Sequence, residues 1–254
     1  MDDAERLARG VVAAERLRRA HVVGAEVLEI DGLVLALSNL PDPALSSVVV
    51  EREPRDAVSA LQEAERQFSR RSLQFGIDLG YRRHRGVDDA MRSMGLTRII
   101  DRPGLAIDPR TFEEARVPEG IEIREVGGPG HAEALVQVGV LAFGDAPEVG
   151  RAFYGATALA RPDDVCSLVA WRGDEPVGIA SAYRDGCTTG VMGVGVIPSA
   201  RRRGLGTALT VRAAEAFPAA DLAWLHPSDE AARAMYERLG FRRVSDWEVW
   251  ARVG

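Results

Sequence analysis

The chain contains no lysine, because all 32 of its basic residues are arginine. It therefore has neither a lysine that could form a Schiff base nor the cation of a nucleotide-binding P-loop. Cysteine is almost as scarce. The two cysteines, Cys166 and Cys187, lie in apolar stretches that predict strands, so we expect two buried thiols rather than a disulfide. Two cysteines also cannot supply the ligand set of a zinc site, and we expect no metal.

Long apolar runs and excess positive charge are also missing. No apolar stretch approaches the roughly 20 residues that span a bilayer. The start of the chain is amphipathic and carries acidic side chains throughout, unlike a signal peptide. The formal net charge of −6 argues against a nucleic-acid-binding protein, which needs a basic face. We therefore expect a cytoplasmic protein with neither a membrane nor a nucleic acid as partner.

The pattern of strands and helices indicates two similar halves. The segment AMRSMGLTRIID at 90–101 resembles MYERLGFRRVSD at 235–246, since in each a helix ends at a glycine and a strand follows. A repeat at about 145 residues is typical of a duplicated domain, with chance similarity as the alternative. We expect an α+β fold, a mostly antiparallel sheet flanked by helices, with domains at 1–115 and 121–254 joined by a linker at 116–120. Exposed sheet edges of the two halves could pair within the chain or across a homodimer.

One strand-to-helix corner, in VGVIPSARRRGLGTAL at 194–209, combines three arginines with two glycines. The first amides of a helix lack partners and the helix dipole adds positive charge, so an anion is stabilised there. Gly204 and Gly206 have no Cβ and let the backbone approach the anion closely. The arginines at 201–203 add donors and positive charge. We therefore predict a phosphate-binding corner, with a tight turn and solvated arginines as the alternative.

This segment, together with a later YERLGF, closely resembles the GNAT superfamily of acyl-CoA-dependent N-acetyltransferases. The family's loop motif, Gln/Arg-x-x-Gly-x-Gly/Ala, is met by Arg201, Gly204 and Gly206. It follows the fourth strand of the domain and opens a helix, as in the family. The family's late Tyr-x-x-x-Gly-Phe motif is met by Tyr236–Phe241. The resemblance covers about residues 121–254. The first half resembles a degenerate copy of the same fold that has lost the glycine loop and the tyrosine, so tandem GNAT-like domains are expected.

The resemblance implies how acetyl-CoA, the expected cosubstrate, is held. Backbone amides of the corner would bind the diphosphate, and the preceding strand would pair with the pantetheine arm as with an added strand. The resemblance also implies that Tyr236 is the general acid that protonates the leaving thiolate. Many relatives have asparagine seven residues before the tyrosine, where this chain has Asp229, which puts one contact to the cofactor in doubt. The implied cofactor-binding residues are Val194, Val196, Arg201, Arg202, Arg203, Gly204, Leu205, Gly206 and Thr207.

The general base and the acceptor site are less well defined. The strand VMGVGV carries no carboxylate, so His226 is the first candidate for the base, ahead of Asp145, Glu148 and Asp185, or of ordered water. An imidazole that only anchors the following loop is the alternative. The loop FGDAPEVGRAF lies where the family's acceptor pocket usually forms. Phe143, Asp145 and Glu148 are therefore the predicted amine-binding residues, with a solvated polar loop as the alternative.

The leading hypothesis is an N-acetyltransferase that moves an acetyl group from acetyl-CoA to a primary amine of a small molecule or peptide. Attack would be direct, because neither cysteine has a base nearby in the sequence. One alternative is a non-catalytic acyl-CoA-binding or regulatory module. Another is an enzyme that binds a nucleotide phosphate at the same corner. The first half would shape the acceptor site or form a dimer interface.

Overall fold

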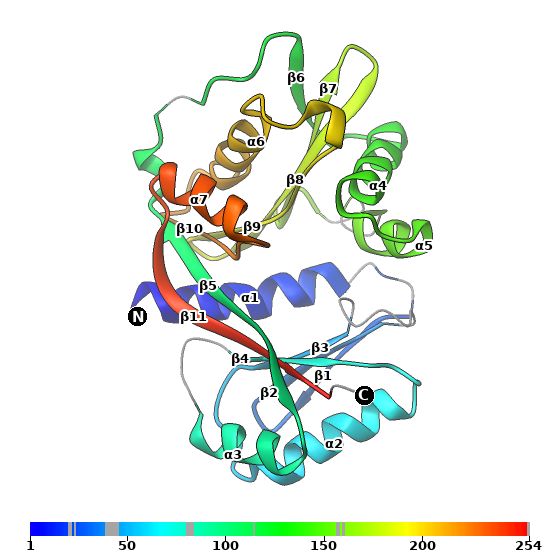
Figure 1. Cartoon of the computed structure of the whole chain (residues 1–254), viewed down its shortest axis with the longest axis vertical. Coiled ribbons are helices and arrows are strands. Elements are labelled where there is room, and N and C mark those ends of the chain that lie inside the picture. The colour runs from blue at the N-terminus through cyan, green and yellow to red at the C-terminus, as the bar shows by residue number, and fades with distance from the viewer. Residues whose placement is uncertain are drawn as a thin grey trace. The chain divides into compact units, whose positions relative to one another are not determined.

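The computed structural model describes residues 1–19, 22, 24–38, 46–79, 84–113, 115–155, 158 and 161–252. It divides into two compact units (Figure 1). Unit 1 comprises Met1–Gly104 and Arg243–Gly254, and unit 2 comprises Leu105–Arg242.

Unit 1 is a sheet with three helices. Its elements are α1 (Asp3–Arg19), β1 (Glu26–Ile30), β2 (Leu33–Leu37), β3 (Ser47–Val50), α2 (Ala57–Ser69), β4 (Gly76–Leu79), α3 (Arg85–Ser93), the first part of β5 (Thr97–Ile107) and nearly all of β11 (Arg242–Ala251). The strand order is β1-β2-β3-β4-β11, and β3 pairs with β4 in parallel while the other neighbours are antiparallel. Asp31 and Gly32 join β1 to β2 with φ angles of 41° and 93°, the left-handed turn that an Asp-Gly pair predicts.

The core of unit 1 forms between this sheet and its helices. On α2, Ala57, Leu61, Ala64 and Phe68 are buried at the three- and four-residue spacing of one helix face. Trp250 of β11 belongs to the same core. A side chain near the C-terminus of the chain therefore packs with the first part of the sequence.

Unit 2 contains the second sheet. Its elements are the end of β5, a 3₁₀ turn η2 (Pro109–Thr111), β6 (Ile121–Glu125), α4 (Pro129–Phe143), α5 (Pro147–Gly150), a π-helical turn η3 (Arg151–Gly155), β7 (Val165–Arg172), β8 (Glu175–Asp185), β9 (Thr188–Val196), a 3₁₀ turn η4 (Pro198–Ala200), α6 (Leu205–Ala214), β10 (Leu222–Leu225) and α7 (Glu230–Arg238). The strand order is β10-β9-β8-β7-β6, and the end of β5 pairs with β10. Of these pairs only β9 and β10 run parallel. The expected α+β class, with mostly antiparallel sheet flanked by helices, is confirmed.

Helices α4 and α6 cover opposite faces of the unit 2 sheet. A Cβ at Gly178 would meet Leu209 of α6, whereas a Cβ at Gly195 would meet Phe143 at the end of α4. Gly178 pairs with Val196, the residue after Gly195. Successive residues of a strand face opposite sides, so the two helices lie on different faces.

The observed division differs from the expected domains 1–115 and 121–254. Strand β11 pairs with β4 of unit 1, with Trp250 opposite Ile77. Conversely, the end of β5 pairs with β10 of unit 2, with Ile107 opposite Ala223. Each unit is thus completed by a strand from the other end of the sequence. The sequence pattern showed that these strands exist but carried no information about their partners.

Within the described ranges, every helix is too short or too polar to cross a lipid bilayer.

Candidate functional site

The corner between β9 and α6 has an unusual backbone. Arg202 and Gly204 are left-handed, with φ angles of 65° and 82°. Helix α6 begins directly after Gly204, without a side-chain cap. Among the described residues, no hydrogen-bond acceptor takes up the amides from Arg202 to Thr207. These amides are therefore available to an anion at a helix N-terminus, as the sequence predicts.

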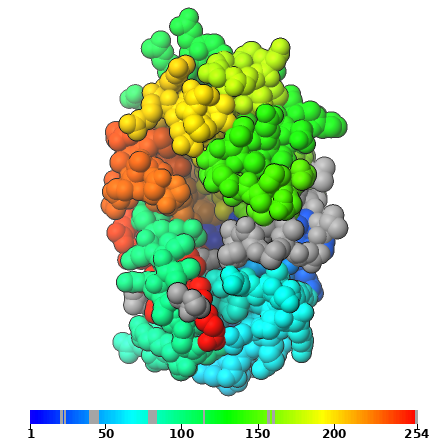
Figure 2. All heavy atoms as spheres, turned by 45° about the vertical axis from the view of Figure 1, so that its right-hand side comes forward, coloured from blue at the N-terminus to red at the C-terminus, as the bar shows by residue number. Residues whose placement is uncertain are grey.

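The three arginines of this corner do different things. Arg201 Nε donates to the Val196 carbonyl at 2.9 Å, and its Nη2 donates to the Ala142 carbonyl at 3.0 Å. Arg201 thus joins the end of α4 to the end of β9. Its guanidinium is engaged by backbone, so it is a brace rather than a spare anion ligand. Arg202 and Arg203 are exposed. The two helices that this brace and the corner belong to adjoin at the surface, where α4 and α5 are green and α6 is gold (Figure 2).

Strand β9 parts from β10 beside the corner. The two pair in parallel only through Thr188–Gly190, and no described strand pairs with 191–196 on that side. A bulge interrupts the β8–β9 ladder between Ile179 and Ser181, and Gly193 in this bulge has a φ angle of 62°.

The backbone groups of Val194 and Val196 point toward the open side of β9. The Ile197 amide donates to the Val177 carbonyl across to β8, so alternation turns the groups of Val196 and Val194 away from β8. Arg201 already occupies the Val196 carbonyl. The Val196 amide and both backbone groups of Val194 therefore remain for an added strand or a ligand.

The glycines near this edge have packing roles that the sequence did not predict. A Cβ on Gly195 would lie 2.8 Å from the Phe143 ring, so this glycine admits the end of α4. A Cβ on Gly206 would lie 3.5 Å from the sulfur of Met235, where α7 approaches α6. The absence of side chains here is therefore explained by helix packing as well as by ligand approach.

Tyr236 lies on α7 and is buried, with its ring 5.9 Å from that of Phe241. Desolvation by burial, and then the charge of Asp229, raise the pKa of Tyr236 to about 12, while a hydrogen bond with Thr210 of α6 acts to lower it. The phenol is therefore protonated at neutral pH. Asp229 is the N-cap of α7 and accepts from the Ala232 amide at 2.7 Å, which gives this departure from the family pattern a local structural role.

The predicted acceptor residues lie on and after the end of α4. Phe143 is 45% exposed, and its ring stacks on that of Tyr154 at 6.1 Å with 13° between the planes. The Tyr154 hydroxyl donates to Asp145 Oδ2 at 3.1 Å. Glu148 lies exposed on α5. The structure therefore brings Phe143 and Asp145 together through Tyr154, a contact nine residues apart that no local motif announced.

His226, the candidate base, directly follows β10, and its ring lies 6.0 Å from that of Trp224. Within the described residues, no group of three or more histidine, cysteine or acidic side chains is placed to hold a metal ion.

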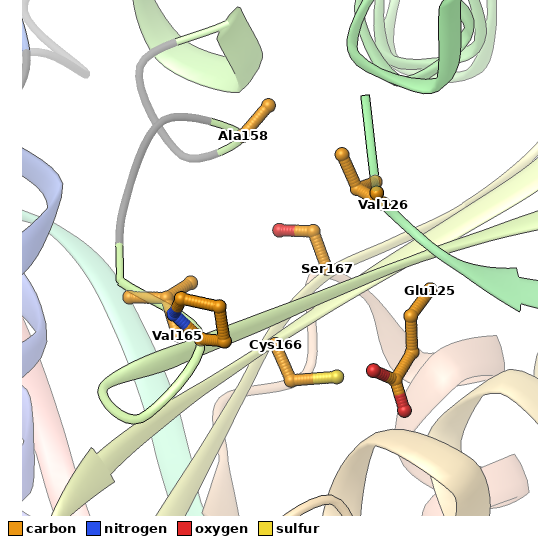
Figure 3. Close-up of a pocket in the computed structure, with 8 residues that line it drawn as sticks. Glu125, Val126, Ala158, Val165, Cys166 and Ser167 are labelled. Carbon is orange, nitrogen blue, oxygen red and sulfur yellow. The ribbon is translucent and has the colours of Figure 1, made fainter. Parts of the chain in front are cut away.

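A separate cavity of about 280 Å³ lies beside β6 and β7, away from the β9 edge (Figure 3). Cys166 and Glu125 point to one side of β7, and Ser167 points to the other. Desolvation, and then the charge of Glu125, raise the pKa of the Cys166 thiol to about 11, so it is a weak nucleophile at neutral pH. The expectation that both cysteines are buried is wrong, because Cys166 is half-buried and Cys187 lies exposed at the β8–β9 turn.

Comparison with known proteins agrees with this geometry. Residues 141–241 match the model of the acetyltransferase (GNAT) family, a range that includes the corner and Tyr236. A GCN5-related N-acetyltransferase from Kribbella flavida is 24% identical over 100% of this chain and 97% of its own, with a TM-score of 0.76. One from Sphaerobacter thermophilus is 20% identical over 98% of this chain and 91% of its own, with a TM-score of 0.63.

A tandem GNAT protein from the clavulanic acid biosynthesis pathway is also similar in structure. It is 18% identical over 86% of this chain and 77% of its own, with a TM-score of 0.58. No curated protein matches the chain significantly. At these identities the solved structures establish the fold, and they confirm the expected tandem arrangement of GNAT-like domains.

Proposed function

Residues 141–241 form a domain of the GNAT acetyltransferase family, and on that premise we propose that the protein is an N-acetyltransferase. It moves an acetyl group from acetyl-CoA to a primary amine of a small molecule or peptide. The observation that carries the proposal is the set of available amides between Arg202 and Thr207, next to a strand edge that lacks a partner.

The corner would hold the diphosphate of acetyl-CoA. Six consecutive amides, the positive end of α6 and the exposed Arg202 and Arg203 all favour an anion there. The pantetheine arm would then lie along β9 and pair with the backbone of Val194 and the Val196 amide, as an added strand pairs with a sheet edge. Leu205 is buried, so it contributes its amide rather than its side chain.

The acceptor would approach from the end of α4. The exposed Phe143 ring offers an aromatic face and Asp145 offers a carboxylate, two groups that attract a protonated amine. Exposed Glu148 adds negative charge to the approach. The amine must lose a proton before it attacks, and His226 is the candidate that takes it.

In the chemical step a C–N bond forms, the thioester C–S bond breaks, and the thiolate leaves. Tyr236 would give its phenolic proton to this thiolate. With the Tyr236 pKa at about 12 and an ordinary thiol near 8.5, that transfer is uphill by about 5 kcal/mol unless the phenolate is stabilised. The site therefore needs a group that supports Tyr236 when it has lost its proton.

The test measures free thiol after incubation with acetyl-CoA and a panel of amines: 2-phenylethylamine, spermidine and trialanine. We expect amine-dependent thiol release by the wild type, and a loss of about 100-fold in Tyr236→Phe. Tyr183→Phe, a buried tyrosine on β8, is the matched control and should keep wild-type turnover. Equal turnover in Tyr236→Phe and the wild type would exclude the proposed acid.

A non-catalytic acyl-CoA-binding module is the second candidate, favoured by one observation. Strand β9 carries no carboxylate near the bulge that could act as a base. Tight binding of CoA by calorimetry, with no thiol release from any amine, would support this candidate. Tighter binding of ATP than of CoA would instead indicate a nucleotide-phosphate enzyme.

A further inference from the structure

Thr210 is a fully buried hydroxyl on α6, in a helix whose other buried side chains are apolar. Its Oγ1 donates to the Gly206 carbonyl at 2.8 Å, one helical turn back. The same hydroxyl hydrogen-bonds with the phenol of Tyr236. Thr210 thus connects the expected acid to the first turn of the helix whose amides would bind the diphosphate.

The chemistry of the partners fixes the direction of this chain. A carbonyl oxygen only accepts, so the single hydrogen of the Thr210 hydroxyl is used by Gly206. Tyr236 must then be the donor to Thr210 Oγ1. The resting order is Tyr236 O–H to Thr210 Oγ1, and Thr210 Oγ1–H to the Gly206 carbonyl.

The order must reverse when Tyr236 loses its proton. A phenolate has no hydrogen to donate, so its contact with Thr210 survives only if Thr210 becomes the donor. A hydroxyl hydrogen rotates about its C–O bond, so Thr210 can turn it from Gly206 to the phenolate without moving a heavy atom. The Gly206 carbonyl loses this bond but keeps its place in the helix.

Packing holds the three groups in register. Met235, the neighbour of Tyr236, lies against Gly206, since a Cβ there would be 3.5 Å from its sulfur. Thr210 itself has no exposed surface. Water therefore does not replace Thr210 as the partner of the phenolate.

We propose that Thr210 is a positioning residue for Tyr236, a hydroxyl that accepts from the phenol at rest and donates to the phenolate once the thiolate has taken its proton. This inference rests on the proposed acid role of Tyr236. No proton is gained or lost in the switch, because the phenolic proton goes to sulfur and the Thr210 hydrogen only rotates. A hydrogen bond to a charged group of this kind is worth about a 10- to 100-fold effect on rate.

Two substitutions separate this role from simple packing. Thr210→Val keeps the shape and removes the hydroxyl, whereas Thr210→Ser keeps the hydroxyl and removes the methyl. Using acetyl-CoA and whichever amine of the panel reacts fastest, we expect kcat to fall 10- to 100-fold in Thr210→Val and less than threefold in Thr210→Ser. The KM for acetyl-CoA should stay within about twofold in both. A packing role predicts the opposite order of the two variants and would overturn the proposal.

A double-mutant cycle tests whether Thr210 acts through Tyr236. We expect Thr210→Val to cause no further loss in the Tyr236→Phe background. Additive losses would mean that Thr210 acts independently. If Tyr236→Phe is slow but Thr210→Val keeps full kcat, only the Thr210 proposal fails. If Tyr236→Phe is as fast as the wild type, the proposed acid itself fails.

A spectroscopic measurement does not depend on turnover. With tyrosine labelled at ¹³Cζ, a slowly exchanging hydroxyl gives a split resonance in an equal mixture of H₂O and D₂O. We expect one such resonance that disappears in Tyr236→Phe, is retained in Thr210→Ser and is lost in Thr210→Val. A wild-type spectrum without this resonance would show that the hydrogen bond is not formed and would overturn the proposal.

Discussion

Replacing Trp250 with alanine should destabilise unit 1, although the sequence pattern assigned this residue to the second domain. Trp250 is 8% exposed within the unit 1 core, and its Nε1 donates to Glu248 Oε2 at 3.0 Å. Truncating a buried tryptophan to alanine costs about 3–5 kcal/mol. For a chain of this length each kcal/mol lowers Tm by about 2–4 °C, so we expect a decrease of about 6–20 °C in calorimetry.

Hydrogen–deuterium exchange with mass spectrometry locates the damage. In Trp250→Ala we expect α2, β3 and β4 to lose protection before β7 and β8, because only the first group shares a core with Trp250. Trp171→Ala on β7 is the matched control. Its side chain packs against the unit 2 core, so its loss of protection should fall on β6–β8.

The opposite pattern would refute the assignment of β11. If Trp250→Ala exposes residues 121–172 and leaves α2 protected, then β11 belongs with unit 2 in solution. An unchanged Tm would likewise contradict the burial of Trp250 in the unit 1 core.

Three further predictions concern charge and reactivity. Burial raises the pKa of Glu15, but neighbouring arginines outweigh it and hold the net pKa below the usual value; its stabilisation is therefore full above about pH 4.3 and is lost as pH falls through the lower folded pKa, so chemical unfolding from about pH 6 to about pH 2 should show a flatter pH dependence in Glu15→Gln. Arg201→Met removes two hydrogen bonds to backbone carbonyls and should weaken CoA binding about fivefold by calorimetry, with Arg212→Met of α6 as the control that binds normally. Iodoacetamide should label exposed Cys187 first and Cys166 about 100-fold more slowly, because the Cys166 pKa is about 11; equal rates would contradict its burial.

The sequence predicted the corner at 201–207 because its signal is local. Glycine adopts the left-handed conformation at the N-cap of α6, and a helix N-terminus presents free amides whatever surrounds it. The start of α2 at Asp56 and the turn at Asp31 and Gly32 are local in the same way. In each case a few neighbouring residues determine the geometry, so the pattern of residue types suffices.

The contacts that the sequence did not predict join segments far apart in the chain. Arg201 reaches the Ala142 carbonyl, 59 residues earlier, and its three neighbouring positions gave no reason to separate it from Arg202 and Arg203. Strand β11 pairs with β4 rather than with strands of its own half. Hydrophobic alternation identifies a strand but does not select its partner, so the completion of each unit by a distant strand needed the structure.

The two units also explain why the anion site is present in only one of them. In unit 1 the equivalent corner begins α2 with Asp56, whose carboxylate accepts from the Ser59 amide at 3.0 Å. Hydrogen bonds from Ser59 lower the pKa of Asp56, so a negative charge already occupies this helix N-terminus at neutral pH. In unit 2 α6 begins at Gly204, which has neither a side chain to cap the amides nor a charge to repel a phosphate. The same helix end is thus closed by its own carboxylate in unit 1 and left open to an external anion in unit 2, so CoA should bind with one equivalent per chain, and a second equivalent in calorimetry would contradict this argument.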